Sequence, residues 1–313
     1  MLFPELSYAR PNDRLVRRVV IRSMEHAAGR TRLARLYRFW REDAARNAGA
    51  RFQSMLDLMR IRLDISGAWP PAIDRAEPLI LVANHPFGIG DGAALLALAE
   101  RLGRPFRILI SNDLMKIEEM AEFGLPISFE ETKAAQALNL RTRKETMRLL
   151  AEGVTIIVFP AGGVATAAKV FGRADDLPWK QFTARLVRMA RATVLPVHVH
   201  GQNGPLFHLV SKWSQTLRYG LLIGAFRRLY GRPIHLTVGA PIRAGDGPAA
   251  LDGPDLTKAL REAVFGLAAS SRPARRGRFK AALTERIARR RAARERPRED
   301  ASSAHGDRAD RLA

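Results

Sequence analysis

The chain of 313 residues contains no cysteine. This absence excludes disulfide bonds, thiolate nucleophiles and metal sites built from cysteine. The seven histidines are scattered, and no two have the His-x-x-x-His spacing that places two zinc ligands on one helix face. We therefore expect a protein that holds no metal ion and needs no bound cofactor.

Long apolar runs are also missing from the sequence. No stretch approaches the roughly 18 residues that a membrane-spanning helix needs, and residues 93–99 form the longest one. The first residues lack the basic stretch and apolar run of a signal peptide. These features predict a cytoplasmic protein that is soluble or lies peripherally on the inner face of the cell membrane.

Positive charge, by contrast, is abundant. The chain has 52 lysine and arginine residues against 31 acidic residues, which gives a formal net charge of +21. Residues 1–50 carry eleven arginines against five acids, and residues 272–298 carry twelve basic residues against two acids. Because arginine suits bidentate binding of phosphate, the candidate partners are anionic lipid headgroups, an acidic carrier protein and nucleic acid.

The N-terminal part of the chain has a helical pattern over residues 12–64. Apolar residues such as Leu33, Leu36 and Trp40 recur on one helix face. In the first segment, arginines alternate with valines, which suits a helix packed on the domain or one lying on an anionic membrane. The helical pattern is broken by Trp-Pro-Pro at residues 69–71.

From residue 78 onward, strand patterns alternate with helical patterns. This alternation predicts an α/β fold with a mostly parallel central sheet flanked by helices. We expect strands near residues 79–83, 106–110, 126–129, 154–159, 194–199 and 233–238, and helices near residues 91–102, 114–122, 138–152, 179–192, 214–229 and 255–269.

The composition changes again beyond Ser270, where Arg, Ala and Glu dominate. Phe279, Leu283 and Ile287 are spaced by four residues, which predicts a basic amphipathic helical tail that ends in a disordered segment. The expected regions are a basic helical region (1–75), an α/β domain (76–270) and an Arg-rich helix with a disordered end (271–313).

The stretch from Asn84 to Asp91 carries a histidine and an aspartate in a glycine-rich turn between a predicted strand and a predicted helix. The carboxyl ends of strands are where α/β sheets place their chemistry. A neutral imidazole can accept a proton near pH 7, and a carboxylate on its other nitrogen fixes the tautomer. His85 and Asp91 are therefore candidate catalytic residues. The alternative is that they only cap the turn and the helix.

Two further motifs follow in order: Phe-Pro-Ala-Gly-Gly at residues 159–163 and Val-Leu-Pro-Val at residues 194–197. Together with Asn-His-Pro…Asp, they resemble the glycerolipid, or lysophospholipid, acyltransferase family. The variant Asn-His-Pro-Phe-Gly, with Pro178-Trp179 downstream, is most similar to the haemolysin-like, ornithine-lipid type of bacterial branch. The resemblance covers roughly residues 75 to 245.

This resemblance implies transfer of a fatty acyl group from a thioester of acyl carrier protein or coenzyme A to the hydroxyl of a lysolipid. The acceptor would be 1-acylglycerol-3-phosphate or a lyso-aminolipid. It implies that His85 deprotonates the hydroxyl as general base and that Asp91 orients it. No acyl-enzyme is required, in agreement with the missing cysteine and the missing Gly-x-Ser-x-Gly elbow.

The residues expected to bind substrate lie around the same motifs. Backbone N–H groups at residues 88–90 and 162–163 could donate to an oxyanion or a phosphate, or these glycines could simply permit tight turns. Lys133, Lys144, Lys169, Arg173 and Lys180 would add to an electropositive rim. The expected substrate-binding residues are Asn84, Phe87, Gly88, Gly90, Arg141, Arg143, Phe159, Pro160, Ala161, Gly162, Gly163 and Trp179.

The sequence departs from the family pattern in two places. The catalytic His and Asp are usually five positions apart but here are six apart, and Gly88 or Gly90 can take up the extra residue. The Phe-Pro block usually has a glutamate where Ala161 stands, and the branch often has a charged residue where Gly163 stands. The sequence thus leaves open which group binds the acceptor at this block.

Two other classes of protein remain as alternatives. The altered block is compatible with a weakly active or inactive lipid-binding protein of the same fold. The net charge alone would fit a nucleic-acid-binding protein, but aromatic residues are few and are not interleaved with the basic segments. The favoured interpretation is an acyltransferase that works at an anionic membrane surface and recognises no specific nucleic acid.

Overall fold

The computed structural model describes residues 3–9, 13–44, 49–213, 215–246 and 251–270. The chain up to Ala269 forms one compact unit. The amphipathic helix and disordered end that the sequence predicts for residues 271–313 lie outside the described residues.

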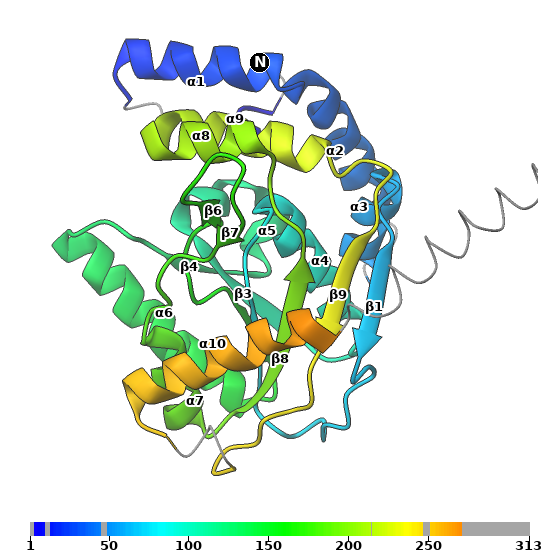
Figure 1. Ribbon diagram of the computed structural model, residues 1–313, viewed down its shortest axis with the longest axis vertical. Helices are drawn as coiled ribbons and strands as arrows, with labels where there is room; N and C mark the ends of the chain where they lie inside the picture. The colour runs from blue at the N-terminus through cyan, green and yellow to red at the C-terminus, as the bar shows by residue number, and fades with distance from the viewer. Residues whose placement is uncertain (1–2, 10–12, 45–48, 214, 247–250, 271–313) are drawn as a thin grey trace, which may run out of the picture. The chain divides into compact units, whose positions relative to one another are not determined.

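A seven-stranded sheet forms the centre of this unit (Figure 1). Neighbouring strands run parallel, except for one antiparallel pair, the second and third strands of the order below. The predicted α/β fold with a mostly parallel sheet is thereby confirmed. In spatial order the strands are β1 (Leu63–Gly67), β9 (Ile234–Val238), β8 (Thr193–His200), β2 (Leu79–Ala83), β5 (Thr155–Val158), β3 (Phe106–Ser111) and β4 (Gly124–Ile127).

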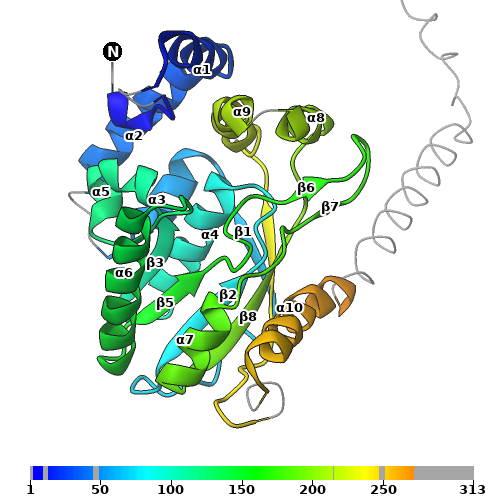
Figure 2. The same ribbon diagram turned by 90° about the vertical axis from the view of Figure 1, so that its left-hand side faces the viewer.

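Helices cover both faces of the sheet (Figure 2). One face packs against α2 (Arg30–Ala44), α3 (Arg51–Leu58), α4 (Ile89–Glu100) and α9 (Gln215–Arg227). The other face packs against α6 (Lys133–Ala151), α7 (Phe182–Ala190) and α10 (Gly253–Ser270). The remaining elements are η1 (Pro4–Leu6), α1 (Leu15–Ala27), η2 (Asn112–Lys116), α5 (Glu118–Ala121), α8 (Pro205–Trp213) and a hairpin of β6 (Thr166–Ala167) and β7 (Ala174–Asp175).

Strand β2 shows why the sequence folds in this way. Its five residues, Leu-Ile-Leu-Val-Ala, are all fully buried, as expected of a parallel strand covered on both faces. Leu79 and Leu81 join the core on one side of the sheet, whereas Ile80 and Val82 join the core on the other. The strand is therefore fixed in position by packing, and so is the turn that leaves its carboxyl end.

Some elements differ from the sequence prediction. The region expected to be helical up to residue 64 ends in strand β1, which pairs in parallel with β9. The predicted helix near 114–122 is a 3-10 turn followed by the short helix α5, and neither α8 nor the β6–β7 hairpin was predicted. Within the described residues, no helix has the length and apolarity needed to cross a bilayer.

Candidate active site

The turn between β2 and α4 places His85 at the carboxyl end of the central strand. Gly88 has a φ of 84°, a left-handed conformation that favours glycine, and a Cβ there would lie 3.0 Å from Val164 and from Leu222. Asp91 is fully buried in the first turn of α4. Its Oδ2 accepts the backbone N–H groups of Phe87 (2.8 Å) and Gly88 (2.9 Å), which closes the turn.

The same oxygen of Asp91 lies 3.0 Å from Nδ1 of His85. The ring N–H does not point straight at the oxygen, and such contacts often align only when substrate binds. The imidazole also stacks on Phe159, with ring centroids 4.2 Å apart and planes 26° apart. Because Nδ1 faces the buried carboxylate, Nε2 is the ring nitrogen left to accept a proton from a substrate.

A second carboxylate, that of Asp176, supports the turn from the other side. Its Oδ1 accepts the backbone N–H of His85 (3.1 Å), and its Oδ2 accepts the indole N–H of Trp179 (2.9 Å). Burial raises the pKa of Asp176 above its ordinary value. On the same turn, the carbonyl of His85 accepts the N–H of Ala165 (2.8 Å). Both the backbone N–H and the carbonyl of His85 are thus hydrogen-bonded.

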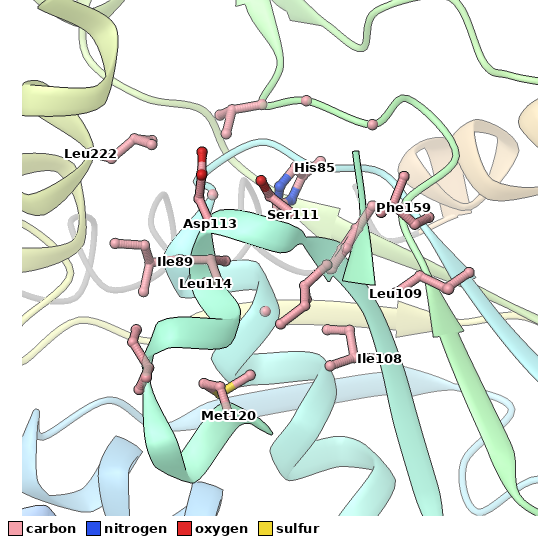
Figure 3. Close-up of a pocket in the computed structure, with 18 of the residues that line it drawn as sticks. His85, Ile89, Ile108, Leu109, Ser111, Asp113, Leu114, Met120, Phe159 and Leu222 are labelled. Atoms are coloured by element: carbon pink, nitrogen blue, oxygen red, sulfur yellow. The ribbon is translucent and has the colours of Figure 1, made fainter. Parts of the chain in front are cut away.

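A cavity of about 1250 Å³ opens beside His85. It exceeds the roughly 300–1,000 Å³ that is typical of small-molecule sites. His85, Ser111 and Asp113 form a polar part of its wall, whereas Ile108, Leu109 and Met120 belong to an apolar part (Figure 3). The apolar lining comes from several elements and includes Leu36, Trp40, Met55, Leu96, Ile108 and Met120. The cavity therefore has the character needed for a long apolar chain with a polar end.

The structure brings many of the predicted site residues to this cavity. Asp91 lies behind the histidine rather than on the wall. The predicted residues that line the cavity are His85, Gly88, Phe159, Pro160, Ala161, Gly162, Gly163 and Trp179, together with Lys180 of the predicted electropositive rim.

Other residues predicted to bind substrate do not line the cavity. The amide of Asn84 binds the backbone of Val199 in both directions, at 2.9 and 2.7 Å, and so ties β2 to β8. Phe87 packs next to Gly201, and Gly90 faces Leu229, where a Cβ would meet the leucine at 2.3 Å. The predicted cations Arg141 and Arg143 lie on α6, away from the cavity wall.

The backbone donors proposed from the glycine turns are also partly engaged. The N–H of Gly88 donates to Asp91, and the N–H of Gly162 donates to the carbonyl of Phe159 (3.0 Å). The N–H groups of Gly88 and Gly162 therefore stabilise their own turns, which agrees with the alternative that these glycines permit tight turns.

Sequence reasoning missed several residues of the cavity wall. Ser111 ends β3, Asp113 lies just after it, and both point into the same space as His85 (Figure 3). Their position after a parallel strand was a usable signal. Arg218 of α9 also lines the cavity. It follows no strand and belongs to no motif, so the sequence gives no local signal for it.

Comparison with known proteins agrees with this geometry. A family model described as "Acyltransferase" matches residues 65–227. A lyso-glycine lipid O-acyltransferase of Bacteroides thetaiotaomicron is 27% identical over 141 residues, which are 44% of this chain and 48% of that protein. The aligned part thus spans about half the length of this curated relative.

Among solved structures, the 1-acyl-sn-glycerophosphate acyltransferase of Thermotoga maritima is 17% identical, with a TM-score of 0.49. The alignment covers 82% of this chain and 97% of the other. In the described part of the chain, no group of three or more His, Asp or Glu side chains is placed to hold a metal ion. Since the family model matches more than half of the sequence, and its region contains the histidine turn and the Phe-Pro block, the chain belongs to the acyltransferase family.

Proposed function

We propose that the protein transfers a fatty acyl group from an acyl thioester to the hydroxyl of a lysolipid, with His85 as general base. The observation that carries this proposal is the imidazole beside buried Asp91 at the polar end of a long apolar cavity. The similarity to a lyso-glycine lipid O-acyltransferase supports a lysolipid acceptor.

The reaction follows from the position of the ring nitrogens. Nε2 of His85 takes the proton of the acceptor hydroxyl while the hydroxyl oxygen attacks the thioester carbonyl. The tetrahedral intermediate collapses, the carbon–sulfur bond breaks, and the imidazolium returns its proton to the leaving thiolate. Asp91 stabilises the imidazolium, and a base in this position contributes about 10²–10⁴-fold to the rate.

The apolar part of the cavity is suited to hold the acyl chain. Its wall combines side chains of α2, α3 and α4 with those of β3. Burial of each methylene there is worth about 0.8 kcal/mol. The bound chain would leave its carbonyl at the polar end, beside His85. Both acyl carrier protein and coenzyme A remain candidate carriers of the donor.

We further propose that the protein works on the anionic inner face of the cell membrane. Helix α1 supports this, because Leu15 and Val16 are 66% and 75% exposed and Arg14 and Arg17 lie exposed beside them. Each basic residue near an anionic leaflet contributes about 1 kcal/mol. The apolar side chains would enter the interfacial region, as in other basic amphipathic helices.

The direct test is acyl incorporation by the purified protein. Each lysolipid of a panel, including lysophosphatidate and a lyso-aminolipid, is offered with acyl carrier protein or coenzyme A thioesters. Transfer to one or more lysolipids is the expected result and also identifies donor and acceptor. Binding of lysolipid without any transfer would replace this proposal with that of a lipid-binding protein.

A further inference from the structure

The Phe-Pro block carries no charged side chain, but a cation from elsewhere occupies the space beside it. The block ends in Gly163, and the guanidinium NH2 group of Arg218 lies 3.7 Å from the position that a Cβ of Gly163 would take. The same nitrogen donates a hydrogen bond to the carbonyl of Val164. Helix α9 thus supplies the positive charge that the block itself lacks.

A second cation lies against the other end of the block. The backbone N–H of Lys180 donates to the carbonyl of Pro160 (3.0 Å). Its Cε is 3.8 Å from the Cβ position of Gly162. Its ammonium lies 4.5 Å from the ring centroid of Phe129, a distance at which the ring holds a cation. Arg218 and Lys180 therefore flank the two glycines, and both line the cavity.

Arg218 is connected through Val164 and Ala165 to the turn that carries His85. Val164, which binds Arg218, precedes Ala165, whose N–H donates to the carbonyl of His85 (2.8 Å). Val164 also approaches the Cβ position of Gly88 to 3.0 Å. A ligand group bound by Arg218 would thus lie near the imidazole, where the acceptor must present its hydroxyl.

We propose that Arg218, assisted by Lys180, binds the anionic headgroup of the acceptor lysolipid, a carboxylate or a phosphate. This inference rests on the proposed acyl transfer. A guanidinium is a planar fork of donors that matches either group, and the hydrogen bond to the carbonyl of Val164 fixes its position beside the block. Gly162 and Gly163 themselves carry no side chain, and Phe129 and Leu177 pack against them at 2.8 and 3.0 Å from their Cβ positions.

The cavity wall also carries acidic side chains, which would repel an anionic headgroup. Asp113, Glu130 and Glu131 also line the cavity, so the wall is not uniformly positive. These carboxylates follow β3 and β4, as does the cation Lys116, whereas Arg218 and Lys180 flank the Phe-Pro block. We expect an anionic headgroup to bind beside Arg218 and Lys180 and not at Arg141 or Arg143, which do not line the cavity.

The test compares Arg218→Gln with Arg228→Gln, an exposed arginine just beyond the same helix that does not line the cavity. Acceptors are lysophosphatidate, a lyso-amino-acid lipid with a free carboxylate, and neutral monoacylglycerol. Arg218→Gln should raise KM about 10–100-fold for the anionic acceptor that is used, as expected when a charge-assisted hydrogen bond is lost. KM for monoacylglycerol and for the thioester should change less than about twofold, and Arg228→Gln should behave like the wild type.

A binding measurement distinguishes failure of this anion site from failure of the proposed acyl transfer. Equilibrium binding of each lysolipid to the full chain needs no turnover, and the Kd of an anionic lysolipid should rise with Arg218→Gln and less with Arg218→Lys. The acceptor with the larger change identifies phosphate or carboxylate as the natural group. Unchanged Kd and KM for all anionic lysolipids, or equal losses for neutral and anionic ones, would refute the anion site. A wild-type protein that binds lysolipid but transfers no acyl group would refute only the proposed function.

Discussion

Asp176 accepts a hydrogen bond from the backbone N–H of His85 with one carboxylate oxygen and from the indole N–H of Trp179 with the other. Trp179 is thereby an anchor of the loop that follows the β6–β7 hairpin as well as a part of the cavity wall. The position of the imidazole thus depends on a residue 91 positions away in the sequence.

Replacement of Asp176 should therefore lower activity through misplacement of the imidazole. We expect Asp176→Ala to reduce kcat/KM about 10²-fold, the size of effect that a displacement of about 1 Å can cause. Trp179→Phe, which removes the indole donor together with part of the ring, should reduce it by less than Asp176→Ala. Steady-state kinetics on folded variants measure both, and an Asp176→Ala enzyme with normal turnover would show that this bond does not position the base.

Gly92 offers a way to fill the apolar cavity without damage to the fold. It lines the cavity, and no atom lies within 4 Å of the Cβ it lacks. Gly92→Leu should raise the free energy of unfolding, by up to about 1 kcal/mol, because leucine is the better helix former. It should also decrease transfer of long acyl chains more than of short ones. Gly92→Ala is the matched control, and equal rates for all chain lengths in both variants would argue against an acyl chain here.

Buried His198 should make stability depend on pH. Burial, with His200 and Arg173 nearby, lowers the pKa of His198 to about 4 from an ordinary value of about 6.5. The unfolded chain therefore binds a proton at a higher pH than the folded chain does. Stability should fall as the pH drops from about 6.5 to about 4, by at most about 3 kcal/mol from this group.

Urea unfolding at several pH values tests this titration. In His198→Phe the loss of unfolding free energy between pH 6.5 and 4 should be smaller than in the wild type, since the titrating group is gone. His200 and His208, whose pKa values are also lowered by burial, would account for part of what remains. The same slope in both proteins would contradict the assignment.

The exposed face of α1 should determine attachment to membranes. We expect Val16→Asp to weaken binding to vesicles with anionic lipid, because it removes an apolar contact and adds a repelled charge. Met189→Asp is the matched control, since Met189 is also exposed (59%) but lies on α7. Co-sedimentation at low and high salt measures the effect, and release at high salt is expected. Equal binding to neutral and anionic vesicles would be evidence against an electrostatic attachment.

The basic residues beyond Ser270 form a separate part of that prediction. A chain cut after Ser270 should bind anionic vesicles less tightly but keep its activity on dispersed lysolipid, because the chain up to Ala269 is compact by itself. Activity lost together with vesicle binding would instead give the removed segment a role in the reaction.

Local patterns in the sequence predicted much of the sheet and the core of the site. The buried run of β2 and the turn that follows it lie within one short stretch, so His85 and Asp91 could be recognised together. Strand β1 was missed because the strand with which it pairs, β9, is distant in the sequence. The hydroxyl of Ser66 in β1, for example, donates to the carbonyl of Leu236 in β9, 170 positions away.

Contacts between segments that are distant in the sequence also account for the site residues that were not predicted. Arg218 reaches the site from a segment without a motif, and Asp176 precedes Pro178-Trp179 without belonging to it. The packing of α9 and of the loop after the hairpin brings both to the site. Conversely, the cations at residues 141 and 143 are near the Phe-Pro strand in the sequence but lie along α6, outside the cavity. Proximity in sequence thus identified the His85–Asp91 pair, which the structure brings together, and Lys180, but not Arg218.

Asp91 should contribute less than His85 to the rate. Asp91→Asn keeps a side chain that can accept the N–H groups of Phe87 and Gly88 but removes the charge that stabilises the imidazolium. We expect kcat to fall, yet by a smaller factor than in a variant without the imidazole. A loss as large as that of the His85 variant would indicate that Asp91 also determines the ring's position.

Acyl transfer by His85→Ala tests the central claim most directly. The imidazole is partly exposed in a turn, with 17% of its side-chain surface accessible, so its removal should leave thermal unfolding and circular dichroism nearly unchanged. With the general base gone, transfer of the acyl group to a lysolipid should fall by about 10²–10⁴-fold. A folded His85→Ala protein with near-normal turnover would contradict the assignment of this residue as the base.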